Sequence, residues 1–210
     1  MAPDPVTLER IYRALKDEYL SGTYQARTRI DLQPLADRHR ASVTPVREAI
    51  YRLIGERLFE AHPEGGFRIA LPDPARLTHL YAWNLQHLLA ALHVTGDAAL
   101  RQALETLRHL VPGTDRLALV HAVGTVFRVI GEATGNPEFA GQVEAANERL
   151  FYPRLAEAMI FRDLAREFGA LSDAGATNVQ KILRRRIIAY HRRRIEHAAQ
   201  IARLISPKYP

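Results

Sequence analysis

Apolar residues recur at helical spacing over most of this chain. Near the N-terminus they fall at Leu8, Ile11, Leu15 and Tyr19, which would form one buried stripe. This pattern predicts an amphipathic helix from Val6 to Leu20.

Residues 35–50 predict two short helices joined by a tight turn. The second helix opens at Ser42 or Thr44, because a hydroxyl side chain can cap the free amides of a helix start. Pro45 suits the first turn, where its missing N–H costs nothing. The apolar positions that follow, and would be buried, are Val46, Ala49, Ile50 and Leu53. The residues left near the other face are Thr44, Arg47, Glu48, Tyr51 and Arg52.

An exposed arginine at the start of such a helix is suited to DNA. The helix N-terminus and the guanidinium both favour phosphate, and arginine can also read guanine. Two strand candidates follow, at residues 57–61 and 67–70, and a turn at 62–66 separates them. A hairpin placed after the second helix of a helix-turn-helix predicts a winged helix.

Residues 6–70 resemble the DNA-binding domain of the GntR family of bacterial transcription regulators. The matching residues are Leu20-Ser21-Gly22, Leu35-Ala36, Ser42 to Ala49, Arg52-Leu53 and Gly65-Gly66-Phe67. The resemblance and the local positive charge give candidate DNA contacts at Gln33, Arg38, Arg40, Ser42, Thr44, Pro45, Arg47, Arg52, Gly65 and Gly66. Val43 departs from the pattern, since relatives usually have an arginine or another polar residue there.

A boundary is predicted at Pro72-Asp73-Pro74, because proline stops regular structure. Residues 1–72 would form the winged helix and residues 73–210 an all-helical bundle, which makes the fold class mainly α. The helices expected in the bundle are Asp73–Val94, Asp97–Leu110, Thr114–Ala133, Pro137–Ile160 (bent or split by Pro153), Phe161–Phe168 and Asn178–Ile205.

The bundle resembles the effector-binding (FCD-like) domain of the FadR subgroup, through Phe127 and the stretch 130–137. Many relatives hold a metal ion there through an Asp and a His. Gly124 and Arg128 occupy those places, and neither side chain can ligate a metal. His197, or less favourably His191, would be the single remaining ligand, so no metal and no cofactor is expected.

The same comparison gives candidate effector-binding residues at Asn84, His121, Arg128 and His197. Asn84 stands where relatives carry a ligand-binding arginine. Arg128 would clamp a carboxylate or phosphate, or would instead pair with Glu132 one turn away. His121 would line a polar pocket or, in the interpretation we favour, be a hydrogen-bonded core histidine.

Two arginine runs, Arg184–Arg186 and Arg192–Arg194, mark the last predicted helix. Three consecutive residues span most of a turn, so the charges cannot share one face. A solvated helix whose arginine stems cover apolar neighbours is the favoured interpretation. An extra phosphate-contacting surface and an interface with a partner subunit are the alternatives.

Composition narrows the function classes. The 210 residues are 47% hydrophobic and 25% charged and include no cysteine, which excludes disulfides and thiolate chemistry. Net charge is +6, yet residues 1–72 contribute only +1, so any affinity for DNA would depend on locally clustered arginines. No secretion signal, membrane-spanning run or catalytic motif is apparent, so we expect a soluble, cytoplasmic protein that is not an enzyme.

Together these features predict a sequence-specific DNA-binding transcription regulator. It would be a homodimeric repressor that binds a palindromic operator in double-stranded DNA and is released by a small acidic metabolite, possibly a carboxylate. Two alternatives stay open. The bundle would be a scaffold or corepressor that binds a protein partner with a degenerate ligand site, or it would be an enzyme with acids converging in a deep cavity.

Overall fold

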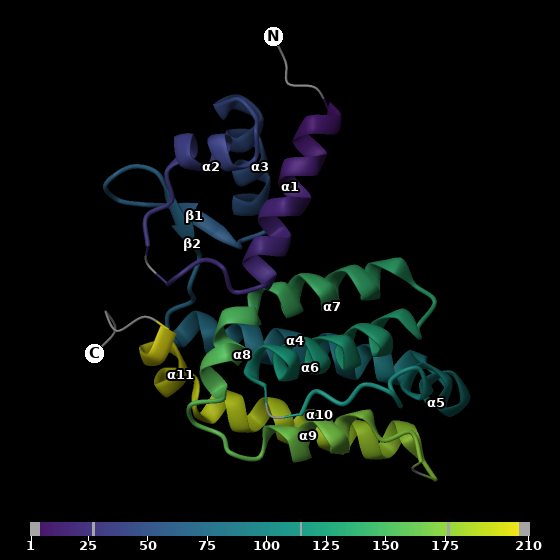
Figure 1. The fold of residues 1–210 in the computed structure, drawn as a ribbon. Helices are drawn as coiled ribbons and strands as arrows, with labels where there is room; N and C mark the ends of the chain where they lie inside the picture. The colour runs from purple at the N-terminus through teal and green to yellow at the C-terminus, as the bar shows by residue number, and fades with distance from the viewer. Residues whose placement is uncertain (1–4, 27, 114, 176, 206–210) are drawn as a thin grey trace. The chain divides into compact units, whose positions relative to one another are not determined.

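The computed structural model describes residues 5–26, 28–113, 115–175 and 177–205. The chain forms two compact units, Met1–Leu71 and Pro72–Pro210 (Figure 1). Each unit has its own elements and its own buried residues.

The N-terminal unit is a winged helix-turn-helix. Its elements are α1 (Pro5–Leu20), α2 (Leu32–Arg38), α3 (Val43–Gly55), β1 (Phe59–Ala61) and β2 (Phe67–Ile69). The two strands pair antiparallel, with Phe59 opposite Ile69, and Ile30 adds a bridge to Phe67. Helices, hairpin and order agree with the sequence prediction.

The core of this unit lies between α1 and α3. Ile11 and Leu15 on α1, and Ile50 and Leu53 on α3, are fully buried. Burying each such side chain contributes about 1.5–3 kcal/mol, so the apolar stripe read from the sequence is what fixes α3 against α1. The other face of α3 is therefore left to solvent.

The C-terminal unit is helical in every regular element that the structure describes. Its helices are α4 (Pro74–Val94), α5 (Asp97–Glu105), α6 (Arg116–Glu132), α7 (Pro137–Arg149), α8 (Phe151–Glu157), α9 (Leu164–Ser172), α10 (Val179–Glu196) and α11 (Ala198–Ile205). Asp73 caps α4 by accepting a hydrogen bond from the amide of Arg76 at 2.8 Å. The prediction of a helical C-terminal region is confirmed.

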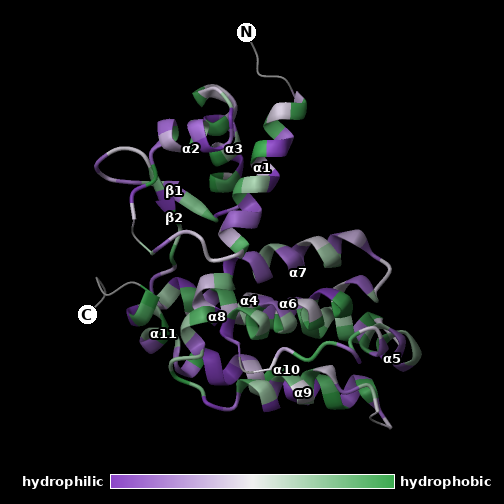
Figure 2. Ribbon diagram, in the orientation of Figure 1, coloured by the Kyte–Doolittle hydropathy of each residue, from purple (hydrophilic) through white to green (hydrophobic). Residues whose placement is uncertain are grey.

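Helices α4 and α6 form the centre of this unit. They contact each other, and α4 also packs against α7, α10 and α11, while α6 packs against α5, α7, α8 and α9. The ribbon coloured by hydropathy shows hydrophobic and hydrophilic stretches mixed along the helices (Figure 2). This mixture fits a bundle in which the helices bury one side and expose another.

Three expected helices end elsewhere. The break expected at Pro153 falls at Leu150, and Pro153 lies in the first turn of α8, where a missing N–H is tolerated. The predicted helix from Asn178 to Ile205 is divided at His197, and α11 then packs on α4 and α8. The short helix expected at 161–168 forms at 164–172. Thr114, the expected start of one helix, lies outside the described residues.

In the part of the chain that the structure describes, no helix combines the length and the apolar character that crossing a membrane requires.

Candidate DNA-binding surface and effector site

The N-terminal half of α3 presents polar side chains to solvent. Ser42, Thr44 and Arg47 are exposed, whereas Val46 and Ala49 are buried beneath them. Ser42 occupies the N-cap position, but its side chain makes no capping hydrogen bond, which corrects the expected cap. Arg47 forms no ion pair with any residue that the structure describes. Its guanidinium therefore remains available to an external anion.

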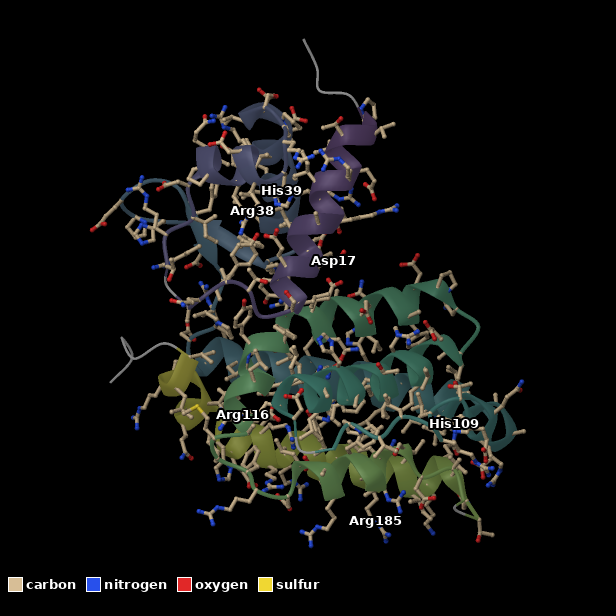
Figure 3. The ribbon with its side chains drawn as sticks, in the orientation of Figure 1. Asp17, Arg38, His39, His109, Arg116 and Arg185 are labelled. Atoms are coloured by element: carbon tan, nitrogen blue, oxygen red, sulfur yellow. The ribbon has the colours of Figure 1, made fainter. Side chains whose placement is uncertain are left out.

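Three other predicted contacts lie around the turn before α3. Gln33 donates to the Asp37 carboxylate at 2.9 Å along its own helix. Arg38 lies 3.3 Å from the Glu18 carboxylate and stays about half exposed, next to His39 (Figure 3). Arg40 is exposed and adopts a positive φ of 50°, which turns the chain into α3. None of these side chains is buried, so each can reach a ligand in solvent.

Two predicted contacts have structural roles instead. Pro45 is buried at the start of α3, where it packs in the core. Arg52 is turned towards α1: its Nη1 lies 2.8 Å from the Glu9 carboxylate, and its Cζ lies 3.6 Å from the centre of the Tyr12 ring. The spacing that placed Arg52 near the exposed face was correct, but the tertiary contact with α1 engages its charge.

The wing turns at Gly65 and Gly66, which have φ values of +87° and +75°. The turn is closed by hydrogen bonds of 3.0 Å from the amide of His62 to the Gly66 carbonyl and from the amide of Gly65 to the His62 carbonyl. Glycine adopts this left-handed conformation without steric cost. The wing tip therefore depends on both glycines for its shape.

The two glycines should differ sharply in their tolerance of alanine. A Cβ on Gly66 would stand 2.8 Å from the backbone carbonyl oxygen of Ile30, whereas a Cβ on Gly65 would meet nothing within 4 Å. We expect Gly65→Ala to cost about 1 kcal/mol of left-handed strain, and Gly66→Ala about 3 kcal/mol because a backbone clash is added. Urea denaturation, with hydrogen exchange at the amides of Ile30 and Phe67, measures both. Equal costs would contradict the contact geometry.

The four candidate effector residues of the C-terminal unit are not brought together in one environment. Asn84 is fully buried and its Nδ2 lies 3.1 Å from His191 Nε2. Arg128 is partly exposed and pairs with Glu132 at 2.7 Å, the alternative that its spacing allowed. His121 is exposed, with its ring 5.6 Å from that of Phe151, so the preferred core interpretation was wrong. The neighbouring apolar residues turn inward, but His121 itself does not.

His197, the fourth candidate, is half-buried where α10 ends. Its Nδ1 lies 2.8 Å from the Arg193 carbonyl oxygen, and its ring packs edge-on against Phe161 at 5.2 Å. These contacts give it a role at the junction of α10 and α11.

Comparison with known proteins identifies the N-terminal unit. Residues 7–69 match the family described as bacterial regulatory proteins, gntR family. The chain belongs to this family. Its members are transcription regulators and not enzymes. The GntR match covers α1 to β2, so it includes the exposed face of α3 and the wing.

Relatives of this GntR-family chain share modest sequence identity. The HTH-type transcriptional repressor GlaR of Escherichia coli (strain K12) is 28% identical over 85 residues, which cover 40% of this chain. The matched segment spans 39% of the length of that curated relative.

Two solved structures share the fold over nearly the whole chain. A GntR protein from Rhodococcus sp. RHA1 superposes with a TM-score of 0.76 at 17% identity, covering 92% of this chain and 96% of that one. E. coli McbR/YncC gives a TM-score of 0.64 at 18% identity, covering 95% and 99%. At these identities the likeness establishes the fold alone.

The metal site that the family resemblance implies is not supported by the side chains present. Gly124 and Arg128 occupy the expected ligand places, and among the described residues no three of the His, Asp and Glu side chains gather as a metal site would require. His191 is committed elsewhere, since its two ring nitrogens contact Asn84 and the Ile187 carbonyl. That this GntR-family chain binds no metal stays a prediction.

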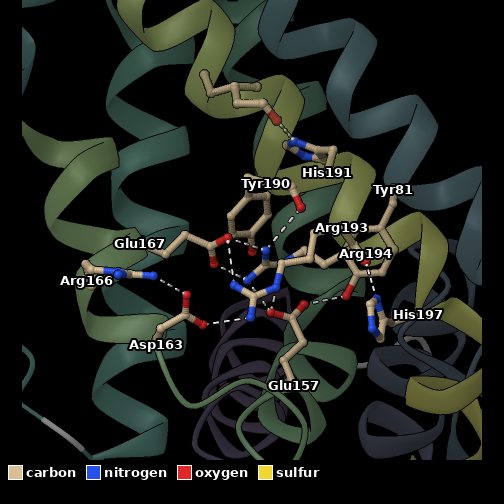
Figure 4. Close-up of polar contacts among 11 residues, drawn as sticks. Tyr81, Glu157, Asp163, Arg166, Glu167, Tyr190, His191, Arg193, Arg194 and His197 are labelled. Atoms are coloured by element: carbon tan, nitrogen blue, oxygen red, sulfur yellow. Dashed lines mark hydrogen bonds and ion pairs between the residues drawn. The ribbon is translucent and has the colours of Figure 1, made fainter.

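Sequence reasoning missed a buried charge network in the bundle. Arg194 is fully buried and lies between two carboxylates, with Nη2 2.8 Å from Glu157 and 2.6 Å from Glu167 (Figure 4). Tyr81 of α4 donates to the same Glu157 at 2.5 Å. Burial and the neighbouring Glu157 charge raise the pKa of Tyr81 well above its usual value. The network ties α4, α8, α9 and α10 together.

The two arginine runs are therefore not one solvated face. Arg184, Arg185 and Arg192 are exposed, and Arg185 lies on the outer side of α10 (Figure 3). Arg193 pairs with Asp163 at 2.7 Å, an ion pair that lowers the pKa of that carboxyl to about 2. The solvated interpretation holds for the first three and is wrong for Arg194. Period alone places Arg194 on the inner side of α10, so its burial had a detectable signal.

Proposed function

We propose that this protein is a dimeric repressor that binds a specific operator through α3 and the wing, and that a small acid releases it. The observation that carries the proposal is the uncovered face of α3 within a GntR-family domain, where Arg47 has no ion partner among the described residues. Arginine at the start of a helix can contact phosphate or read guanine in the major groove.

Several further features support this proposal. The curated relative GlaR is named a repressor, which favours repression over activation here. A homodimer would match a palindromic operator, because the two-fold axis of a dimer is mirrored in paired half-sites. Binding to chromosomal DNA would place the protein in the cytoplasm. The helical C-terminal unit would provide the dimer contact and sense the acid, whose binding can shift the protein only by its different affinity for two states.

Arg47→Ala tests the DNA-binding proposal. Fragments of the source genome are selected with wild type and variant, and affinity for the enriched sequence is then measured by fluorescence anisotropy at fixed salt. We expect the variant to lose about 1–3 kcal/mol, which is roughly 5- to 150-fold, because one arginine contact to a base or phosphate is removed.

Arg52→Ala is the matched control, since it removes the same charge from the same helix. Arg52 is engaged by Glu9 and Tyr12, so we expect its loss to change operator affinity less than about 3-fold, well below the cost of a base contact. No enriched motif with wild type, or equal losses in both variants, would reject α3 as the reading element.

A further inference from the structure

Arg154 on α8 is a buried cation without a carboxylate partner. Its side chain is 3% exposed, yet it forms no ion pair with any residue that the structure describes. Both terminal nitrogens donate to the single amide oxygen Oδ1 of Asn147, at 3.1 Å each, and Nε has no hydrogen-bond partner. Arg194, by contrast, is met by two carboxylates. A buried charge held by an amide alone is costly unless another group compensates it.

The surroundings of Arg154 contain two more buried polar atoms without partners, Asn84 Oδ1 and the Tyr190 hydroxyl. They gather around Phe127, whose ring centre lies 5.4 Å from the Arg154 Cζ, 5.2 Å from the Tyr190 ring and 5.5 Å from the His191 ring. Native cores rarely leave such atoms unsatisfied, and a cluster of them indicates a place where a ligand binds.

The charge of this cluster is set by His191. Its Nδ1 lies 2.8 Å from the Ile187 carbonyl, so this nitrogen carries the proton, and Nε2 accepts from Asn84 Nδ2. Burial and the two nearby arginines lower the pKa of His191 to about 3, so the ring is neutral. The cluster therefore carries one positive charge, on Arg154, and one negative charge would neutralise it.

Space for a small group exists beside Gly124 on α6. A Cβ built on Gly124 would meet one described heavy atom within 4 Å, Nη1 of Arg154 at 3.8 Å. Gly124 is also partly exposed, which provides a path from solvent. The Asn147 amide, which donates to the Gly124 carbonyl at 3.0 Å, holds Arg154 against this position.

We propose that Arg154 is the anchor of an anion site beside Gly124, and that its ligand is a small monocarboxylate. Of the five N–H donors of a guanidinium, two are used by Asn147, and the edge that includes Nε remains free for two parallel bonds to a carboxylate. A single positive charge matches a monoanion better than a doubly charged phosphate. The proposal rests on the proposed function, in which the C-terminal unit senses a small acid, and moves the site from Arg128 to Arg154.

A matched pair of variants at Gly124 tests this site. Gly124→Asp places a carboxylate of the chain itself next to Arg154, whereas Gly124→Ala adds only a Cβ at an ordinary contact distance. We expect Gly124→Asp to raise the unfolding temperature above that of Gly124→Ala, and to abolish the response to added carboxylate. Wild type, Gly124→Ala and Arg128→Ala should retain that response.

The probes are formate, acetate, propionate and benzoate, compared with chloride and inorganic phosphate at equal ionic strength. Thermal shift and titration calorimetry on the full chain should show binding of at least one carboxylate, and Arg154→Lys should weaken it at least 10-fold because the free edge is lost. No carboxylate binding to wild type, an equal response to chloride, or an unchanged response in Gly124→Asp would each overturn the proposal.

A separate measurement of operator binding distinguishes this proposal from the proposed function. Carboxylate binding by a chain that selects no operator would uphold the site and reject the regulator. Operator binding without any carboxylate response would do the reverse.

Discussion

Replacement of Arg194 by methionine is expected to lower the free energy of unfolding by about 3–5 kcal/mol. The change removes the cation that lies 2.8 Å from Glu157 and 2.6 Å from Glu167, and it leaves both carboxylates near the core without compensation. The 3.1 Å hydrogen bond to the Tyr190 carbonyl is lost as well. Urea denaturation followed by the fluorescence of Trp83, the one tryptophan of the chain, reports on the unit that contains this network.

Two companion variants make the interpretation sharp. Arg185→Met removes an exposed arginine from the same helix, and we expect it to change stability by no more than about 0.5 kcal/mol. In the double variant Arg194→Met/Glu157→Gln, one uncompensated charge is neutralised, so part of the loss should be recovered. If Arg194→Met unfolds within 1 kcal/mol of wild type, on the scale of a surface pair, the network is not structural.

Stability should fall as pH is lowered from about 6.5 towards 3, and His191 should account for much of the slope. The folded pKa of His191 is about 3, mainly because burial disfavours the charged ring, whereas an unfolded histidine titrates near its usual value of about 6.5. Between these values the unfolded chain binds a proton that the folded chain does not. The contribution is therefore complete above about pH 6.5 and falls by up to about 1.4 kcal/mol per pH unit below it.

His191→Gln should remove this slope, because glutamine does not titrate. Its stability at pH 7 will be lower than that of wild type, since the ring packs against Phe127 and Tyr190. The informative quantity is thus the pH dependence of urea unfolding, followed at Trp83, at pH 7, 6 and 5. His109→Gln, in which an exposed side chain is changed, is the control and should keep the wild-type slope. Equal slopes in all three proteins would show that His191 is protonated in the folded state.

These two expectations concern the same region of the bundle. Arg194 and Tyr190 belong to the paired network, while His191, on the next residue, belongs to the cluster around Phe127 with Arg154. A paired arginine and an unpaired one therefore lie on either side of one helix segment. The physical contrast between them, full compensation against a single amide, is what separates a structural group from a proposed ligand anchor.

The sequence by itself determined the fold class, the winged helix and the exposed face of α3. These are local properties: helical spacing fixes which residues of α3 are buried, and the turn signal at Gly65 and Gly66 fixes the hairpin. The arginines behaved differently. Arg47 and Arg52 lie five residues apart on one helix, yet only the contact with Glu9 and Tyr12 of α1 separates a free charge from an engaged one.

The tertiary structure alone decided the interior of the bundle. Glu157, Glu167 and Arg194 are far apart in sequence, and no periodicity indicates that they meet around one guanidinium. In the same way, Asn147 and Arg154 have no special spacing, and their importance comes from a place where burial leaves a charge without a carboxylate. Local patterns predict which side chains turn inward, whereas compensation of a buried charge depends on which distant segments pack against it.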